Sequence, residues 1–151
     1  MTFTPWWSRV LSFLLDGILV AVPSSIAGLV DPHNAALAVT LGVLSLVLLA
    51  YNRWYLGGRT GQSWGKRVMD THLHRRSTGG TVGAGTAFVR DVCHVLDALP
   101  CFLGFLWPLW DDRRQTFADR IVATVVTPAV TPLPEPLAPN WQAPRRPEDA
   151  A

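Results

Sequence analysis

The sequence predicts an all-α membrane protein built on a two-span helical hairpin. Of its 151 residues, 49% are hydrophobic and only 16% are charged, whereas soluble domains carry about 25% charged residues. Two apolar runs of membrane-spanning length follow one another near the N-terminus. Tryptophans flank the apolar runs, as expected of rings at the headgroup level of a bilayer: Trp6, Trp7, Trp54, Trp107 and Trp110. A third amphipathic or re-entrant helix, a short cytoplasmic β-like loop and a disordered Pro-rich tail complete the prediction.

The first apolar run covers residues 10–30 and contains one charged residue, Asp16. A cleaved signal peptide is the alternative, but an aspartate inside the run and a second run soon after argue against it. A carboxylate at this depth costs about 2.5 to 3.5 kcal/mol, so Asp16 should face protein or water. Arg9 precedes it by seven residues, which places both side chains on nearly the same helical face.

The second predicted span covers residues 35–55 and follows a tight turn at 31–34. The turn contains no Lys or Arg, whereas residues 52–80 carry six of them against one acid. The positive-inside rule therefore places the 52–80 loop and the N-terminus in the cytoplasm.

A glycine-rich segment, GGRTGQSWGKR, opens this basic loop. It invites comparison with a phosphate-binding loop, but Thr60 stands where that pattern needs glycine and Arg67 replaces its Ser or Thr. We interpret the segment as a turn that lays Arg59, Lys66 and Arg67 against anionic lipid headgroups. No nucleotide or other cofactor is predicted.

Beyond this turn the pattern favours a short surface hairpin, in which residues 68–73 pair with 81–82. His72 and His74 alternate with Leu73 and therefore share one strand face. A solvated strand is favoured over a metal site because no third ligand is evident nearby. The two cysteines also lack zinc-binding spacing, so no metal is predicted.

Residues 87–110 form the third apolar element. Four of its side chains fall at i, i+4, i+7 and i+11 and share one helical face: Arg90, His94, Asp97 and Cys101. This polar face must avoid lipid, and Arg9 with Asp16 is its expected contact. The alternative is an ion pair within the helix, between Arg90 and Asp97.

Pro100 breaks this helix, and the remaining apolar residues up to 110 are too few to span a bilayer alone. Basic residues lie on both sides of the element, in 53–76 and in 113–120. A single crossing would place one basic cluster outside the cell, so we favour an element that dips in and returns. A full third crossing is the alternative.

The C-terminal part is polar at 111–120, and the β-branched run at 121–127 predicts either a strand or a helix end. Residues 128–151 contain seven prolines and few large apolar residues. Such a composition predicts a disordered tail.

With these residues in view, the chain resembles the RDD family of small bacterial membrane proteins, which is named for one arginine and two aspartates. Arg9 and Asp16 look like the family's arginine and first aspartate. GRTGQSWGKR at 58–67 is similar to its glycine-rich segment, and AFVRD at 87–91 is similar to the segment that contains its later arginine, here Arg90.

RRQTFADRIVATVV at 113–126 is close to the closing motif of the family and places the second aspartate at Asp119. Ala118 and Ala123 stand where many relatives carry glycine. The resemblance covers about residues 5–127, so we expect an RDD-like membrane domain at 1–127. It implies a multi-pass protein of the bacterial cytoplasmic (inner) membrane that is suspected of transport.

Two functional hypotheses remain from the sequence. In the first, the protein is a non-catalytic membrane partner or scaffold, and the four family-motif charges form a structural salt-bridge lock: Arg9, Asp16, Arg90 and Asp119. In the second, it transports a proton or small cation along Asp16, His94 and Asp97. Two spans cannot enclose a pore, so transport would require a homo-oligomer.

An enzyme is not expected, because the sequence offers no nucleophile–base pair, metal-ligand set or cofactor motif. No run of Lys and Arg exceeds two residues, so no nucleic-acid partner is expected. The predicted partners are the lipid bilayer and either a second copy of the chain or another membrane protein.

Overall fold

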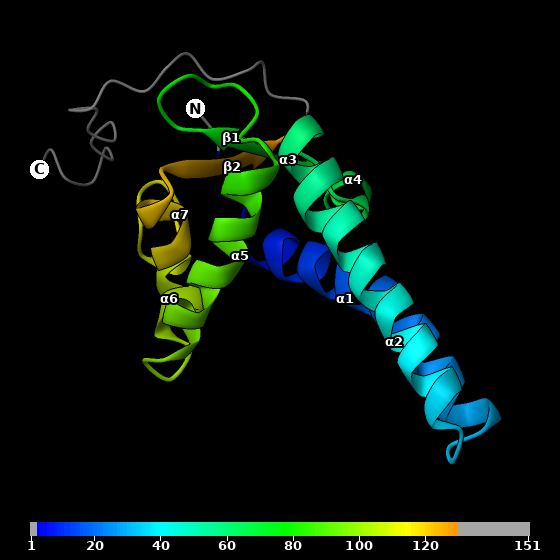
Figure 1. The fold of residues 1–151 in the computed structure, drawn as a ribbon. Helices are drawn as coiled ribbons and strands as arrows, with labels where there is room; N and C mark the ends of the chain where they lie inside the picture. The colour runs from blue at the N-terminus through cyan, green and yellow to red at the C-terminus, as the bar shows by residue number, and fades with distance from the viewer. Residues whose placement is uncertain (1–2, 130–151) are drawn as a thin grey trace, which may run out of the picture.

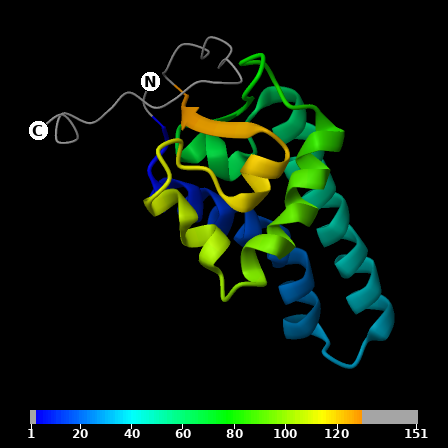
Figure 2. The same ribbon diagram turned by 90° about the vertical axis from the view of Figure 1, so that its left-hand side faces the viewer.

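A computed structural model describes residues 3–129 of the chain. Two long helices form a hairpin that projects from the rest of the molecule, and the remaining elements gather around one end of it (Figures 1 and 2). The described elements, in chain order, are α1 (Trp6–Val30), α2 (Ala35–Leu49), the π-helix η1 (Ala50–Leu56), α3 (Gly57–Thr60), α4 (Trp64–Val68), β1 (Thr71–Arg75), α5 (Ala84–Ala98), α6 (Leu103–Leu106), the 3₁₀ helix η2 (Trp107–Leu109), α7 (Phe117–Ile121) and β2 (Thr124–Pro128).

The hairpin contains both predicted spans. Helix α1 has 25 residues, and the helical stretch Ala35–Thr60 has 26, so each is long and apolar enough to cross a membrane. Asn34 begins the second helix by accepting a hydrogen bond from the backbone N–H of Leu37 at 3.0 Å. Large apolar side chains cover the outside of the hairpin and remain exposed, as Leu29 (84%) and Val39 (65%) show.

The two strands form an antiparallel pair in which Leu73 of β1 faces Val126 of β2. The predicted pairing of 68–73 with 81–82 is therefore wrong. The partner of β1 comes from the far end of the described chain, and local alternation cannot reveal so distant a strand. Leu73 and Val126 form a small buried core with Val82 and Ala87.

The sequence left a strand and a helix end as alternatives for residues 121–127, and the structure contains both. Helix α7 ends at Ile121, Ala123 adopts a left-handed conformation with φ 53°, and β2 begins at Thr124. The prediction of a solvated strand around His72 and His74 is wrong, because His74 is only 2% exposed.

The third apolar element starts at Ala84, earlier than predicted, and ends its first helix before Pro100. The segments Ala84–Ala98 and Leu103–Leu109 are bent by 108° relative to each other. The prediction that Cys101 shares the polar face of α5 is wrong, because it lies beyond the helix end, is exposed and has a φ of 51°. The predicted tail at 128–151 lies outside the described residues from 130 onward.

Candidate functional site

The first polar network centres on Asp119, which is fully buried near the start of α7. Thr116 and Asp119 form a capping box. The Thr116 hydroxyl accepts from the N–H of Asp119 at 3.1 Å, and the Asp119 carboxylate accepts from the N–H of Thr116 at 3.3 Å. This reciprocal pair satisfies N–H groups that a helix start otherwise leaves unbonded, and it fixes the aspartate side chain.

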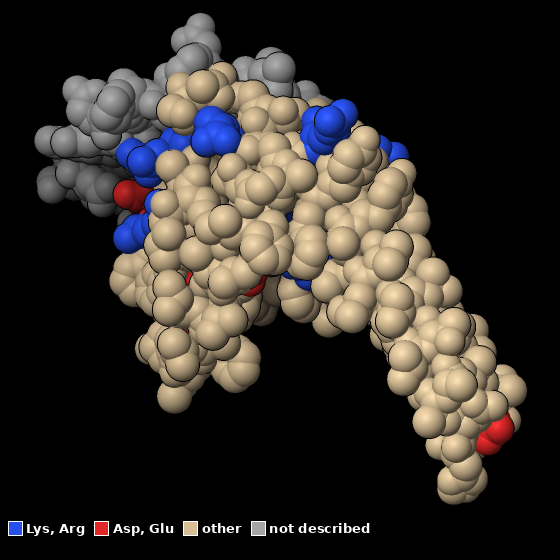
Figure 3. Space-filling view, viewed as in Figure 1, with Lys and Arg blue, Asp and Glu red and all other residues tan. Residues whose placement is uncertain are grey.

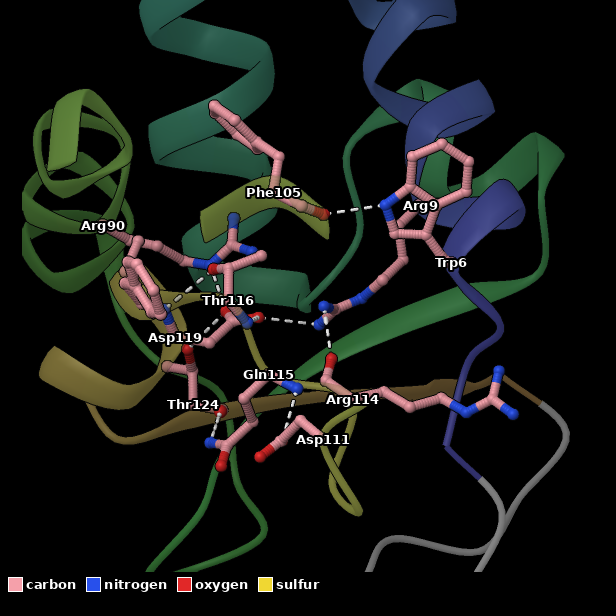
Figure 4. A network of polar contacts seen from close by, with 12 residues as sticks. Trp6, Arg9, Arg90, Phe105, Asp111, Arg114, Gln115, Thr116, Asp119 and Thr124 are labelled. Carbon is pink, nitrogen blue, oxygen red and sulfur yellow. Dashed lines mark hydrogen bonds and ion pairs between the residues drawn. The ribbon is translucent and has the colours of Figure 1, made fainter. Parts of the chain in front are cut away.

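The Asp119 carboxylate accepts four hydrogen bonds, which matches its number of lone-pair positions (Figure 4). Arg90 Nε donates to Oδ1 at 2.7 Å, and Arg9 Nη2 donates to Oδ2 at 2.8 Å. The hydroxyl of Thr124 supplies a further bond to Oδ1 at 3.0 Å. One carboxylate thus joins α1, α5, α7 and β2.

Two neighbouring guanidinium groups keep this carboxylate ionised. Burial alone would raise the pKa of Asp119, but the charges of Arg90 and Arg9, with the Arg90 hydrogen bond, hold it well below its ordinary range. Asp119 therefore remains charged at every physiological pH.

The start of α1 is held by two further contacts to backbone oxygens. Arg9 Nη1 donates to the carbonyl of Arg114 at 2.6 Å, and the indole Nε1 of Trp6 donates to the carbonyl of Phe105 at 2.7 Å (Figure 4). The N-terminal turn of the hairpin is thereby attached to both the α6 segment and the loop before α7.

A second buried carboxylate, Asp97, lies beside this network. Its Oδ2 is 2.5 Å from Nδ1 of His94, and its Oδ1 accepts from the backbone N–H groups of Phe117 and Ala118 at 2.8 and 3.3 Å. Asp97 thus connects the end of α5 to the first turn of α7.

The other network centres on Asp16, which is 2% exposed. Asn52 Nδ2 donates to its Oδ1 at 2.7 Å, and the N–H of Gly65 donates to the same oxygen at 2.8 Å. The hydroxyl of Ser63 donates to Oδ2 at 2.5 Å. Asn52 in turn accepts from the N–H of Trp64 at 2.9 Å, so the glycine-rich segment is fastened to α1 through one carboxylate.

Gly65 permits this close approach. A Cβ atom at this position would lie 2.1 Å from the carbonyl oxygen of Ser12 and 3.0 Å from the carboxylate of Asp16. Any side chain here would push α4 away from α1 and break the bond to Asp16.

A third contact joins the end of the hairpin to α5. Arg53 Nη2 and the indole Nε1 of Trp54 donate to the two oxygens of Asp91, at 2.8 and 2.9 Å. The ring of Trp54 also packs edge-on against Phe88, with 4.8 Å between the ring centroids.

A cavity of about 470 Å³ separates α1 from the α5–α6 segment. The molecule has two arms, the α1–α2 hairpin and the α5–α6 segment. The space-filling view shows the hollow between them, with charged atoms visible at its upper end (Figure 3). Arg9, Asp16 and His94 line it together with Arg53, Lys66, Arg90 and several apolar side chains.

The family model that matches this chain is the RDD family, and the match covers residues 3–123. The chain belongs to the RDD family. This confirms the resemblance seen in the sequence.

Two curated relatives of this RDD protein are mycobacterial. A proline-rich antigen of Mycobacterium leprae (strain TN) is 35% identical over 152 residues, an alignment that covers 83% of this chain and 61% of the relative. A proline-rich antigen homolog of Mycobacterium tuberculosis (strain ATCC 25618 / H37Rv) is 32% identical over 153 residues, which covers 84% of this chain and 64% of the relative. The chain thus spans less than two thirds of each relative. No solved structure matches it.

The structure brings three of the four RDD charges together and places the fourth apart. Arg9 and Arg90 both bind Asp119, whereas Asp16 binds the glycine-rich segment. The contact expected between the polar face of α5 and Arg9 with Asp16 forms only in part. Arg90 meets Arg9 at the shared carboxylate of Asp119, whereas the Asp16 carboxylate accepts from Asn52, Ser63 and Gly65. The alternative ion pair between Arg90 and Asp97 is not formed.

The predicted ion path is brought together only in part. His94 bonds to Asp97, and His94 and Asp16 line the same cavity, but the three hydrogen bonds of the Asp16 carboxylate go elsewhere. Of the predicted headgroup contacts, Arg59 and Arg67 are exposed, whereas Lys66 lines the cavity. Their contact with lipid stays a prediction.

Sequence reasoning missed Asn52, Ser63 and Gly65 as the partners of Asp16. Asn52 is a lone amide at the end of an apolar run, which is a weak signal for a buried polar contact. Thr116 was missed as well, although Thr-x-x-Asp at 116–119 carries the spacing of a capping box.

Proposed function

We propose that this RDD protein is an integral membrane protein that acts as a non-catalytic scaffold or partner. We further propose that its four family-motif charges stabilise the fold through buried hydrogen bonds and ion pairs: Arg9, Asp16, Arg90 and Asp119. The saturation of Asp119 carries the proposal. Four donors from α1, α5, β2 and the capping box occupy its carboxylate. A carboxylate bonded in this way cannot accept a substrate or ion without losing contacts that hold the fold together.

Placement in a membrane is supported by the hairpin. Its two helices are long enough to cross a bilayer. Their outer faces expose large apolar side chains, and contact of this apolar surface with water would be unfavourable. The basic residues of 52–80 favour a cytoplasmic location for that loop and for the N-terminus. The 108° bend after α5 favours a re-entrant third element over a full crossing. The location that follows is the bacterial cytoplasmic membrane.

Transport of a proton or small cation by Asp16 is the second candidate. It is favoured by one observation, that Asp16 and His94 line the same cavity. The three donors on the Asp16 carboxylate weigh against it, because an ion would have to compete with Asn52, Ser63 and Gly65. Transport would also need a homo-oligomer to enclose a path.

Flux and stability measured on the same preparations separate these functions. Wild type, Asp16→Asn and Asp119→Asn are purified in detergent, and exposed Asp112→Asn serves as the matched control. We expect both buried variants to unfold at lower temperature than the control, because each leaves buried donors without their charged partner. We expect proton and Na⁺/K⁺ flux in liposomes to stay at background for all four proteins.

Wild-type flux that Asp16→Asn abolishes, with unchanged melting, would overturn the scaffold proposal and establish transport. Unchanged melting of both buried variants would show that the motif charges do not stabilise the fold.

A further inference from the structure

The cavity between the arms combines an apolar wall with a cationic end. Aromatic and aliphatic side chains from both arms supply the wall: Phe13, Phe102, Phe105 and Leu106. Its volume of about 470 Å³ falls within the roughly 300 to 1,000 Å³ typical of ligand pockets. An occupant that fits it must be largely apolar.

Four cationic residues line the cavity against a single acid, and three of them already have partners. Arg9 and Arg90 bind Asp119, and Arg53 binds Asp91. The one lining acid, Asp16, is occupied by three donors from other residues. The fourth cation is Lys66.

The Lys66 ammonium forms no hydrogen bond or ion pair with any residue in the described range 3–129. Its backbone lies in the first turn of α4, where Ser63 begins the helix. Burial, together with the charges of Arg90 and Arg53, lowers the pKa of Lys66 to about 8, against smaller opposing effects of Asp16 and Asp91. A partly buried ammonium that shares a cavity with other cations is stabilised by an added anion.

We propose that this cavity binds one anionic phospholipid, with its phosphate against Lys66 and Arg53 and an acyl chain along the aromatic wall. The proposal rests on the membrane placement given above. An amphiphile satisfies both halves of the cavity, whereas free phosphate would leave the apolar wall unfilled. Basic pockets on the cytoplasmic side of membrane helices commonly hold anionic headgroups, and Lys66 belongs to the loop expected on that side.

Native mass spectrometry of the full chain, delipidated in detergent, tests the proposal. The probes are dioleoylphosphatidylglycerol, dioleoylphosphatidylcholine with the same chains and a neutral headgroup, and inorganic phosphate. Lys66→Gln removes the unpaired cation. Arg114→Gln removes an exposed cation that does not line the cavity and is the matched control.

We expect wild type to prefer phosphatidylglycerol over phosphatidylcholine. Lys66→Gln should weaken phosphatidylglycerol binding about fivefold, the effect typical of one basic contact to an anionic lipid. Arg114→Gln should bind as wild type does. A second variant, Leu106→Trp, fills part of the cavity beside the apolar wall without changing its charge. It should also weaken phosphatidylglycerol binding.

Equal binding of the two lipids by wild type, or unchanged phosphatidylglycerol binding in both Lys66→Gln and Leu106→Trp, would overturn the proposal. Displacement of phosphatidylglycerol by inorganic phosphate would identify a phosphate site and overturn it too. A spectrum in which neither lipid binds and the chain appears as a dimer would assign the cavity to an interface between two copies instead. These outcomes leave the scaffold proposal intact, since that proposal depends on flux and melting.

Discussion

Arg9 and Asp119 lie 110 residues apart in the sequence, yet Arg9 Nη2 donates to Asp119 Oδ2 at 2.8 Å. The contact closes the described chain on itself, because it attaches the first turn of α1 to the helix before the last strand. A second bond from the same guanidinium, to the carbonyl of Arg114, uses a different nitrogen. The planar fork of arginine is therefore needed at this position.

Arg9→Lys tests that geometry. Lysine keeps the charge but places it at a single point, so it cannot make both bonds in the same directions. We expect the variant to lose about 1.5 to 3 kcal/mol of unfolding free energy, the value of one charge-assisted hydrogen bond. A double-mutant cycle with Asp119→Asn in detergent should give a coupling of about 1 to 3 kcal/mol. Additive effects would show that the two residues are not energetically linked.

Gly65→Ala should prevent α4 from docking on α1. The added Cβ would meet the backbone carbonyl of Ser12, which cannot move without shifting the helix. We expect a loss of about 3 kcal/mol or more, because overpacking is combined with a broken bond to Asp16. Gly17→Ala is the matched control, since nothing lies within 4 Å of its Cβ. Equal thermal melting of the two variants would contradict the close approach at Gly65.

Two alanines near the end of the described chain, Ala118 and Ala123, should respond in opposite directions when each is replaced by glycine. Ala123 has a left-handed φ of 53°, which is strained for alanine, so Ala123→Gly should stabilise the protein by about 0.5 to 1 kcal/mol. Ala118 is a fully buried helical residue, so Ala118→Gly should destabilise it by about 1 kcal/mol. Chemical denaturation in detergent measures both, and a shared sign would contradict the assigned backbone conformations.

The histidine pair of β1 predicts a loss of stability in mild acid. The rings of His72 and His74 stack with 4.2 Å between their centroids. Burial, together with the neighbouring His72, lowers the pKa of His74 to about 4. Between about pH 6.5 and 4, His74 binds a proton in the unfolded chain but not in the folded chain. The free energy of unfolding therefore falls as the pH drops through this range.

The expected loss over that range is about 1 to 3 kcal/mol. His74→Gln should flatten the dependence of the denaturation midpoint between pH 7 and 4.5, and His33→Gln in the exposed hairpin turn is the matched control. An undiminished slope in His74→Gln would assign the acid sensitivity to other groups.

Single cysteines at Ser77 and Ala138, in a background without Cys93 and Cys101, test the proposed topology. If the third element re-enters, both positions lie in the cytoplasm, and a membrane-impermeant maleimide added to intact cells should label neither. A cysteine placed at His33, in the turn between the two spans, is the positive control. Labelling of Ala138 without Ser77 would favour three crossings.

Much of the architecture could be predicted because it depends on local patterns. The two long helices follow from apolar runs, their connection from the Asp-Pro turn, and α5 from the spacing of Arg90, His94 and Asp97. Its end follows from Pro100. Each of these signals acts within a few residues, which is why the helix boundaries were close to those observed.

The partners of the charged residues could not be predicted in the same way. Arg9 and Asp16 share a helical face, and that spacing suggested a pair, but each bonds to a segment distant in sequence: Arg9 to Asp119, and Asp16 to Gly65. The strand at Thr71–Arg75 likewise pairs with Thr124–Pro128 and not with the neighbouring residues 81–82.

The sequence by itself therefore determined the helical hairpin, the family and the list of charges that need burial. Only the tertiary structure decided that Asp119 binds two arginines, that Asp16 holds the glycine-rich segment, and that Lys66 lines a cavity without an ion-pair partner among residues 3–129. The physical reason is the separation along the sequence over which each interaction acts. Helix formation responds to the side chains of a few turns, whereas a buried charge is stabilised by whichever donors the folded chain brings within hydrogen-bonding distance.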